Sequence, residues 1–474
     1  MIRVRFAPSP TGYLHIGNVR TALFNYLFAK RNGGKFILRV EDTDLERSRL
    51  EYRRALVEDL RWMGIEWDEG PEKGGEYAPY LQSERLDVYR DYVQRLLDQG
   101  RAYYCFVTEE EVEESKRLAK LERRPPRFDN RGRLFSPKEI EERKSRGIRP
   151  TVRFKIEKPQ LKMHDLIRGE VSFNLDDMVG DFVIQRADGT PTFHLAVCVD
   201  DGLMRVTHVI RGEDHLSNTP KHILLLQAMG FTPPQYGHLS LIHGPGGEPL
   251  SKRLESVSVR EFRRQGYLPH ALANYIALLG WSPGDNREIF TWEELIKTFS
   301  IEQINKSAST YDPAKLDWVN GQHLRALCDA EFTDSAMDFL KTHGNLPVDE
   351  TKLRAVLPVF KDNVARFGEL PDRLEILKED FEYENKTMMA APESQEVFKA
   401  GLEALPLLQA SGEALYEEFV NALKARVKVK GKQLFMPIRL ALTGKEHGPE
   451  LKKIFPIFGM EEVRRRLERA LKSV

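Results

Sequence analysis

The chain has few cysteines: Cys105, Cys198 and Cys328 are the only three in 474 residues, and they are far apart. Because there is no CxxC pair and no cysteine–histidine cluster, the sequence predicts neither a disulfide framework nor a zinc site. It also has no apolar run long enough to span a bilayer, and no apolar segment behind basic residues at its start. We therefore expect a cytoplasmic protein that does not enter a membrane.

A net charge is also absent, because 72 lysines and arginines balance 72 aspartates and glutamates. Such a chain can bind nucleic acid only through a local basic patch, so its overall charge neither supports nor excludes an RNA partner. No internal repeat or low-complexity linker occurs. A length of 474 residues exceeds what one hydrophobic core usually holds, and it predicts two to four domains.

The first forty residues carry the clearest structural pattern. Residues 2–6 alternate between apolar side chains and arginine, which predicts a strand, and apolar residues recur at helical spacing over 19–27. A glycine pair at 33–34 ends this helix, and residues 35–40 predict a second strand. In such a strand–helix–strand unit the first loop lies at the amino end of the helix, where N–H groups favour a phosphate.

The loop itself contains residues that suit this role. Pro8, Pro10 and Gly12 make it rigid and sharply turned, and Gly17 has no Cβ to keep a ligand from the backbone. His15 precedes the helix, where its ring could donate to a phosphoryl oxygen. The alternative is an ordinary turn with a surface histidine.

The segment Leu14-His15-Ile16-Gly17-Asn18 resembles the HIGH motif of class I aminoacyl-tRNA synthetases, with Asn18 in place of the second histidine. The longer string from Arg5 to Asn25 resembles the glutamyl-tRNA synthetases, and its length makes it more specific than a four-letter motif. The resemblance implies an α/β fold: a Rossmann-type parallel-sheet catalytic domain split by an inserted α+β domain, then helical stem-contact and all-helical anticodon-binding domains.

Four polar residues, Glu41-Asp42-Thr43-Asp44, follow the second strand, at the end of a sheet where ligands bind. Asp44 or Ser48 could instead cap the next helix. The resemblance assigns to the amino-acid substrate the residues Arg5, Ala7, Ser9 and Glu41. This agrees with their chemistry, because a guanidinium matches a carboxylate and a carboxylate suits an α-ammonium group.

Two later segments also resemble the family. Residues 191–201 are interpreted as the strand at which the sheet resumes, and 206–211 as the next strand. Within and just after them the resemblance implies contacts of glutamate with Phe193, Val197 and Arg211, and of ATP with Glu213. Arg211 could instead be a structural partner of Asp200 or Asp201. We favour the substrate role, because selecting glutamate needs a second cation besides Arg5.

A glycine-rich segment, 244–253, ends in Ser251-Lys252-Arg253. Its spacing is not that of a P-loop, and it resembles the KMSKS signature of class I synthetases. Without the resemblance it would be interpreted as a surface loop. The resemblance implies that ATP is bound by Pro10, His15, Gly17, Asn18, Glu213, Leu250, Ser251, Lys252 and Arg253, with His15 and Lys252 catalytic.

The expected domains follow from these segments. They are a first catalytic half (1–99), an inserted domain that contacts the tRNA acceptor end (100–189), a second catalytic half (190–245), a stem-contact helical domain (246–323) and two anticodon-binding helical subdomains (324–380 and 381–474). Some bacterial relatives bind zinc through cysteines flanking the position of Cys105. Here Phe106 and Val107 follow that residue, so we predict no zinc.

Basic residues occur in two places that could meet RNA. The cluster at 123–127 suits either a phosphate contact or a solvated loop. The stretch 422–432 suits a phosphate backbone, or a strand edge of alternating lysines.

Asn363 and Arg366 are candidates for reading an anticodon base.

The resemblance extends from residue 2 to about 470 and implies a bacterial-type glutamyl-tRNA synthetase. Glutamate and ATP with Mg²⁺ would form glutamyl adenylate and pyrophosphate, and tRNA(Glu) would then accept the glutamyl group. A monomer is expected. The rivals are a glutamyl transferase for a modified tRNA base, which lacks an anticodon-binding region, a small-molecule adenylyltransferase, and an inactive tRNA-binding paralogue.

Overall fold

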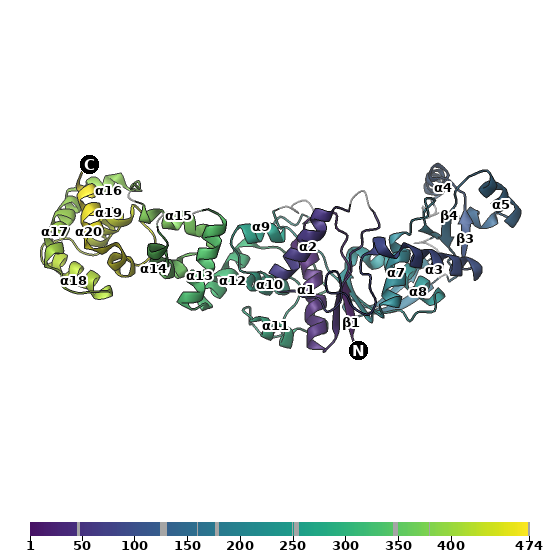
Figure 1. The fold of residues 1–474 in the computed structure, drawn as a ribbon. Coiled ribbons are helices and arrows are strands. Elements are labelled where there is room, and N and C mark those ends of the chain that lie inside the picture. Colours follow the sequence, from purple (N-terminus) through teal and green to yellow (C-terminus); the bar gives the residue numbers. More distant parts are fainter. Residues whose placement is uncertain are drawn as a thin grey trace. The chain divides into compact units, whose positions relative to one another are not determined.

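The computed structural model describes residues 1–44, 48–123, 130–158, 160–175, 180–248, 250, 256–344, 349–378 and 380–472. The chain forms two compact units (Figure 1). The first unit contains Met1–Glu261 and Leu272–Asp312, and the second contains Phe262–Ala271 and Pro313–Val474. Within the described part of the chain, no helix has the length and apolar character needed to cross a bilayer.

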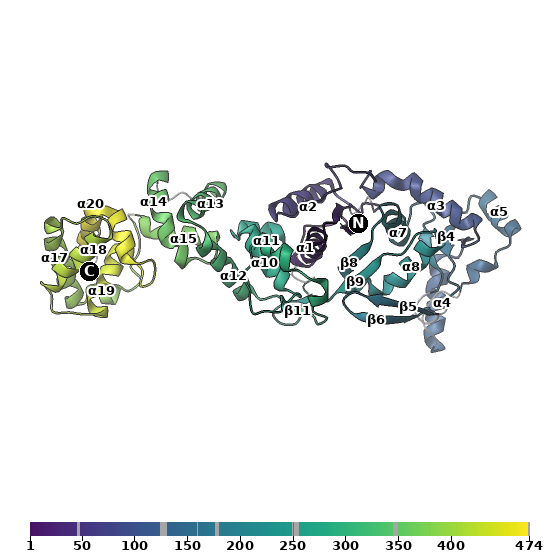
Figure 2. The ribbon, with the colours of Figure 1, turned by 90° about the horizontal axis from the view of Figure 1, so that it is seen from below.

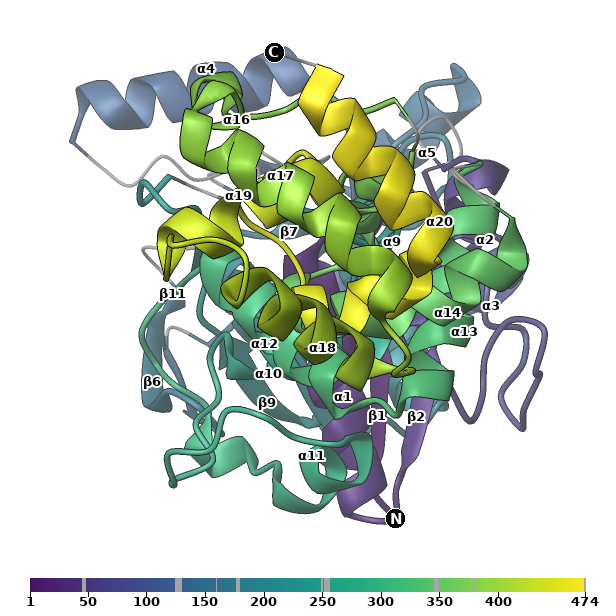
Figure 3. The ribbon, with the colours of Figure 1, turned by 90° about the vertical axis from the view of Figure 1, so that its left-hand side faces the viewer.

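The first unit begins with the predicted strand–helix–strand motif. Strand β1 (Arg3–Phe6) pairs in parallel with β2 (Lys35–Leu38), and helix α1 (Ile16–Arg31) connects them. Figure 3 shows α1 beside these two strands. All four residues of β1 are buried, as expected for a strand covered on both faces. The motif predicted from residues 2–40 is therefore confirmed.

A second parallel pair lies beside the first. Strand β8 (His208–Gly212) pairs with β9 (Gln235–Leu239), and helix α8 (Thr219–Ala228) connects them after the 3₁₀ turn η3 (Glu213–Asn218). The backbone N–H of Thr207 donates to the carbonyl of Arg3 at 2.9 Å, which places the start of β8 beside β1. The loops that follow β1 and β8 therefore lie at one edge of the sheet.

The segment 191–201 forms a helix, and its interpretation as a strand was wrong. Helix α7 (Phe193–Leu203) begins after Thr192, and Leu195, Cys198 and Val199 are buried in one apolar cluster with residues of α8. A buried helix of this length is apolar on most of its surface. Periodicity alone cannot distinguish such a helix from a buried strand.

The inserted region contains a separate three-stranded antiparallel sheet. Its order is β3 (Ala102–Cys105), β4 (Thr151–Phe154) and β7 (Phe182–Gln185). Helix α3 (Leu86–Asp98) leads into it, and two helices rich in charged residues, α4 (Glu109–Leu121) and α5 (Pro137–Ser145), lie between β3 and β4 in the sequence. Most of the basic cluster at 123–127 lies outside the described residues.

Residues 160–174 form a hairpin. Strand β5 (Gln160–Asp165) turns into β6 (Gly169–Asn174), because the Asp165 carboxylate accepts the N–H groups of Ile167 and Arg168 and so stabilises a turn. β5 pairs in parallel with β9 at Asp165 and Tyr236. The hairpin therefore belongs to the same four-stranded sheet as β8 and β9, in the order β6-β5-β9-β8 (Figure 2).

Further elements complete the first unit. Helix α2 (Leu50–Trp62) follows β2, and its N-cap is Arg49 without a side-chain hydrogen bond, so neither Asp44 nor Ser48 caps it as the alternative required. Strand β10 (Ile242–His243) pairs with β11 (Ser309–Thr310). The other elements of this unit are η1 (Gln82–Arg85), η2 (Arg131–Leu134), α11 (Trp292–Thr298) and η5 (Ile301–Gln303). Helices α9 (Val259–Arg264) and α10 (Pro269–Leu278) each have residues in both units.

The second unit is helical throughout its described part, which confirms the prediction of a helical carboxyl-terminal third. Its helices pack on one large apolar cluster that contains Phe332, Phe360, Phe398 and Phe455. The α-helices are α12 (Pro313–Ala326), α13 (Asp329–Thr342), α14 (Glu350–Phe360), α15 (Leu370–Leu374), α16 (Lys386–Ala390), α17 (Pro392–Ala404), α18 (Glu413–Lys424), α19 (Lys432–Thr443) and α20 (Leu451–Lys472). The short 3₁₀ turns are η6 (Lys361–Asn363), η7 (Phe367–Glu369), η8 (Glu375–Leu377) and η9 (Leu405–Leu407).

Candidate functional site

A cavity of about 640 Å³ lies in the first unit where the strands β1, β2, β8 and β9 end. Its walls come from the loop after β1, the start of α1, and the segments that follow the other three strands. In an open α/β sheet this edge is where ligands bind. The predicted site residues that line it are Arg5, Ala7, Ser9, His15, Gly17, Asn18, Glu41, Phe193, Arg211 and Leu250.

Three other predicted site residues do not line this cavity. The Pro10 carbonyl accepts the N–H of Arg49 at 3.3 Å, and Val197 is buried within α7. Glu213 accepts the N–H of Leu241 at 2.9 Å and forms an ion pair with Arg168. The remaining predicted residues, Ser251, Lys252 and Arg253, lie outside the described residues.

His15 caps helix α1 with its side chain. Its Nδ1 accepts the backbone N–H of Gly17 at 3.2 Å, and burial lowers the pKa of the imidazole, so the ring is neutral at neutral pH. In a neutral ring whose Nδ1 accepts, the proton is on Nε2, which is then a donor. A Cβ on Gly17 would lie 3.0 Å from the His15 ring, so glycine keeps this space open.

The segment that follows the glycine-rich loop pairs with the His15 segment. The N–H of Ile16 donates to the carbonyl of Val257 at 3.1 Å, and the N–H of Val259 donates to Leu14 at 2.9 Å. On the other side of the loop, Leu250 lines the cavity. Described residues on both sides of 251–255 therefore lie at the cavity or beside its histidine.

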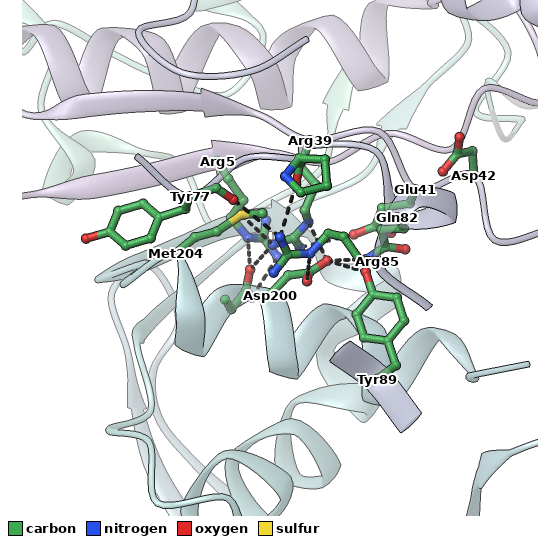
Figure 4. Close-up of polar contacts among 12 residues, drawn as sticks. Arg5, Arg39, Glu41, Asp42, Tyr77, Gln82, Arg85, Tyr89, Asp200 and Met204 are labelled. Carbon is green, nitrogen blue, oxygen red and sulfur yellow. Dashed lines mark hydrogen bonds and ion pairs between the residues drawn. The ribbon is translucent and has the colours of Figure 1, made fainter. Parts of the chain in front are cut away.

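A cluster of buried arginines and carboxylates that pair with one another lies next to the cavity (Figure 4). The Arg39 guanidinium is fully buried and contacts Asp201 at 2.7 Å, Glu41 at 3.2 Å and Asp200 at 3.8 Å. Arg85 donates to Asp200 at 2.7 Å, and Arg5 donates to Asp201 at 3.2 Å. Each of the two aspartates therefore contacts two arginines.

The hydrogen-bond partners of Arg211 are neutral groups instead. It donates to the Nε2 of His238 and the Nδ1 of His222, both at 3.3 Å, to the carbonyl of His215 at 3.2 Å, and to the Thr219 hydroxyl at 2.8 Å. Burial lowers the pKa values of Arg211 and of all three histidines. Among its contacts in the described part of the chain there is no carboxylate.

This arrangement favours the substrate role over the structural role for Arg211. Asp200 and Asp201 pair with other arginines, so neither is its partner. A buried guanidinium without a carboxylate carries a large desolvation cost, which a ligand's carboxylate would offset. Because Arg211 lines the cavity, it is placed to bind such a ligand.

Glu41 supplies the opposite charge. Its carboxyl lines the cavity, and burial raises its pKa to about 6 even though Arg39 donates to it. A ligand ammonium would therefore stabilise its ionised form. With Arg5 and Arg211 on the same cavity, the site matches a molecule that carries one cationic and two anionic groups.

Several lining residues were missed by the sequence analysis. Arg20 is buried and donates to the carbonyls of Leu279, at 2.9 Å, and Ser240, and burial lowers its pKa to about 10. Residues 240–243 also line the cavity because they follow β9. The strand-end position was the available signal for them. The other missed residues include Thr21, Asp214 and His215.

Comparison with known families agrees with this geometry. The model described as "tRNA synthetases class I (E and Q), catalytic domain" matches residues 1–318. The chain belongs to the class I tRNA synthetases (E and Q). In this synthetase a second family model, described as "Anticodon binding domain", matches residues 331–471.

Similar proteins span the whole synthetase chain. A glutamate–tRNA ligase of Carboxydothermus hydrogenoformans is 45% identical, covering 98% of this chain and 99% of the relative. One from Sulfurihydrogenibium sp. is 44% identical over 99% of both chains. The crystal structure of a glutamate tRNA ligase from Elizabethkingia meningosepticum, in complex with its amino acid, has a TM-score of 0.88 and 34% identity, with 99% of each chain covered.

Two predictions about the rest of the synthetase bear on sites outside this cavity. In the described residues, no group of three or more His, Cys, Asp or Glu side chains could hold a metal ion, and the absence of zinc stays a prediction. Arg366 contacts the Tyr267 hydroxyl at 2.7 Å and Asp317 at 3.1 Å, so its guanidinium binds within the second unit. Asn363 ends the turn η6.

Proposed function

We propose that this class I synthetase joins L-glutamate to the 3′ end of tRNA(Glu) in two steps that consume ATP. The observation that carries the proposal is the Arg211 guanidinium, which lines the cavity without a carboxylate among its contacts. A side-chain carboxylate is what distinguishes glutamate from most other amino acids. The similar proteins named glutamate–tRNA ligase support the same substrate.

In this proposal the glutamate is held at three points. Arg211 binds the side-chain carboxylate, and Glu41 binds the α-ammonium group. Arg5 lines the cavity and also forms an ion pair with Asp201. Its guanidinium can therefore donate to the α-carboxylate of the substrate while it keeps the ion pair with Asp201. Phe193 lines the same wall and gives the methylene groups of glutamate an apolar contact.

ATP occupies the His15 side of the cavity. The Nε2–H of His15 and the amino end of α1 donate to its phosphates, and Lys252 supplies a cation from the adjoining loop. The proposal for Lys252 rests on Leu250 and Val257, which place both ends of the loop at the cavity and its histidine. Mg²⁺ arrives as part of the nucleotide substrate.

The chemistry needs no protein nucleophile. An α-carboxylate oxygen of glutamate attacks the α-phosphorus, the bond to the bridging oxygen breaks, and pyrophosphate leaves. A hydroxyl of the terminal ribose of tRNA then attacks the activated carbonyl and releases AMP. The protein's part is positioning and charge stabilisation, and one well-placed donor typically contributes about 3 kcal/mol.

A cavity of about 550 Å³ in the second unit supports a tRNA partner. Tyr416 and the partly exposed Phe435 line it together with Lys424, Arg439 and Lys452. Two carboxylates, Glu417 and Glu450, belong to the same lining, and Glu450 lies 3.4 Å from Lys452. Aromatic rings beside cations are typical of sites that stack unpaired bases and hold their phosphates. We place the anticodon loop here, within the segment that matches the anticodon-binding family.

The proposal is tested by glutamate-dependent exchange of pyrophosphate into ATP, with and without tRNA, followed by charging of purified tRNAs. Periodate-oxidised tRNA(Glu) is the decisive control, because oxidation destroys the terminal ribose and leaves the bases in place. We expect charging of intact tRNA(Glu) only. Glutamyl transfer to the oxidised tRNA would instead identify an enzyme that modifies a base.

A further inference from the structure

One feature beside the cavity is a buried line of three side chains that ends at Arg211. Asp165 contacts His238 at 2.5 Å between Oδ2 and Nδ1, and the Nε2 of His238 accepts from the Nε of Arg211 at 3.3 Å. Asp165 and His238 are both fully buried. Neither lines the cavity, so they can act on a substrate only through Arg211.

We infer that Asp165 and His238 are positioning residues that hold the Arg211 guanidinium in place for the side-chain carboxylate of glutamate. This inference rests on the proposed function, since it assigns Arg211 to that carboxylate. It adds two residues from other elements to the recognition of the amino acid. One of them belongs to the region predicted to contact the tRNA acceptor end.

The orientation of the Asp165 carboxylate is determined by the turn that it stabilises. Its Oδ1 accepts three backbone N–H groups, from Ile167 at 3.0 Å, Arg168 at 2.9 Å and His238 at 3.3 Å. Its Oδ2 is left to face the imidazole. Burial raises the pKa of Asp165, but these hydrogen bonds outweigh it and hold the pKa below its ordinary value.

An ionised carboxylate at Nδ1 determines which nitrogen of His238 carries the proton. Since a carboxylate only accepts, Nδ1 donates to it and Nε2 keeps a lone pair. Burial lowers the pKa of His238, so the ring stays neutral. Its Nε2 is then an acceptor for Arg211 and for the Thr219 hydroxyl, which lies 3.0 Å away.

Two more contacts restrict the same guanidinium. Thr219 accepts from Nη2 of Arg211 at 2.8 Å, and the Arg211 guanidinium lies 5.4 Å from the centre of the Tyr236 ring. Tyr236 stacks on His238 and pairs with Asp165 in the β5–β9 register. Side chains of the β5–β6 hairpin, β9 and α8 thus form one connected set of contacts that ends at Arg211. The side of the guanidinium that these contacts leave open faces the cavity.

The sharpest test is Asp165→Asn, which keeps the size of the side chain. The three backbone donors require the amide oxygen at the Oδ1 position, so the amide nitrogen must face His238. The imidazole then has to accept at Nδ1 and carry its proton on Nε2, where it opposes the N–H of Arg211. We expect the KM for glutamate in pyrophosphate exchange to rise on the order of tenfold, with the KM for ATP within about twofold.

A second pair of variants keeps the test valid if Asp165→Asn does not fold. His238→Gln can place an amide oxygen near the Nε2 position, whereas His238→Leu cannot accept at all. His238→Leu should raise the glutamate KM on the order of tenfold or more, and His238→Gln should recover most of the loss. The matched control is Glu170→Gln in the same hairpin, whose exposed partner is His164 at 2.8 Å.

The outcomes separate the inference from the function on which it rests. If Arg211→Lys loses glutamate-dependent exchange while Asp165→Asn and His238→Leu keep the wild-type glutamate KM, the positioning role is wrong. A fall in kcat alone, with unchanged KM values, would indicate lost active protein and would also overturn it. If the wild-type protein shows no exchange that depends on glutamate, the proposed function itself fails.

Discussion

The first unit contains two groups of buried arginines that are organised in opposite ways. In the group around Arg39, every guanidinium forms an ion pair with a carboxylate. Asp200 pairs with Arg39 and Arg85, and Asp201 pairs with Arg39 and Arg5. Around Arg211, the partners are histidines, a hydroxyl and a carbonyl. The first group is balanced within the protein, whereas the second keeps a charge that a substrate can balance. Arg5 belongs to the first group and also lines the cavity, so it is Arg211 alone among these four arginines that lines the cavity without a carboxylate partner in the described part of the chain.

The largest effect is expected for Arg211→Leu. Removing the cation leaves the glutamate carboxylate without a partner, and this should lower kcat/KM for glutamate in pyrophosphate exchange by on the order of a thousandfold, or about 4 kcal/mol. Thermal unfolding should be little changed, because the leucine removes a buried charge that has no carboxylate partner. If Arg211→Leu lost much of its thermal stability but kept normal pyrophosphate exchange, Arg211 would have a structural role and not a binding role.

Arg39→Leu should show the opposite pattern. It leaves Asp200, Asp201 and Glu41 buried with one cation fewer, and breaking such a cluster costs about 3–5 kcal/mol of unfolding free energy. Urea denaturation measures this loss. Because Glu41 and Arg5 belong to the same cluster, some activity will be lost as well, so the comparison with Arg211→Leu must use stability. An Arg39→Leu protein as stable as the wild type would contradict the structural role of this cluster.

Lys252→Ala tests the proposed ATP side of the cavity. The variants of Arg211 and Arg39 do not test that side. Loss of one cation at the triphosphate should reduce kcat for exchange by on the order of a hundredfold, or about 3 kcal/mol, with the glutamate KM nearly unchanged. The control is Lys424→Ala in the second unit, which should leave exchange intact and weaken only tRNA-dependent charging. Near-normal exchange by Lys252→Ala would refute its assignment.

The smallest effect is a pH dependence of glutamate binding. Burial raises the pKa of Glu41 to about 6, and below that pH the carboxyl is protonated and no longer attracts an ammonium group. The glutamate KM should therefore rise about tenfold as the pH falls from about 7 to about 5, while glutamate's own carboxyl groups stay largely ionised. Glu41→Gln should have a high KM that is independent of pH over this range. If the glutamate KM of Glu41→Gln still varied with pH as in the wild type, a group other than Glu41 would be responsible for the titration.

The sequence was most informative where function depends on neighbouring residues. The strand–loop–helix at residues 2–31 places Arg5, His15 and Gly17 together through local geometry, and its pattern predicted both the fold and the position of the cavity. Resemblance added Glu41, Phe193 and Arg211, which line the same cavity although the sequence separates them widely.

What the sequence could not predict depends on pairing over long separations. The contact between Asp165 and His238 joins residues 73 positions apart and requires the β5–β9 register, which no local pattern encodes. The partner of Arg211 could not be chosen either, because three other arginines, Arg5, Arg39 and Arg85, compete with it for Asp200 and Asp201. The sequence alone does not distinguish these four arginines. The helix at 193–203 was misread because its burial depends on α8.

The β5–β6 hairpin has a practical consequence for protein engineering. It lies within the stretch 100–189, which was expected to be an inserted domain, yet β5 pairs with β9 of the four-stranded sheet and Asp165 contacts His238 behind Arg211. If Asp165 positions Arg211 as proposed, a chimaera that exchanged this stretch between two synthetases would also exchange part of the glutamate-binding site. Grafts intended to alter only the handling of RNA should therefore keep residues 160–174 from the host.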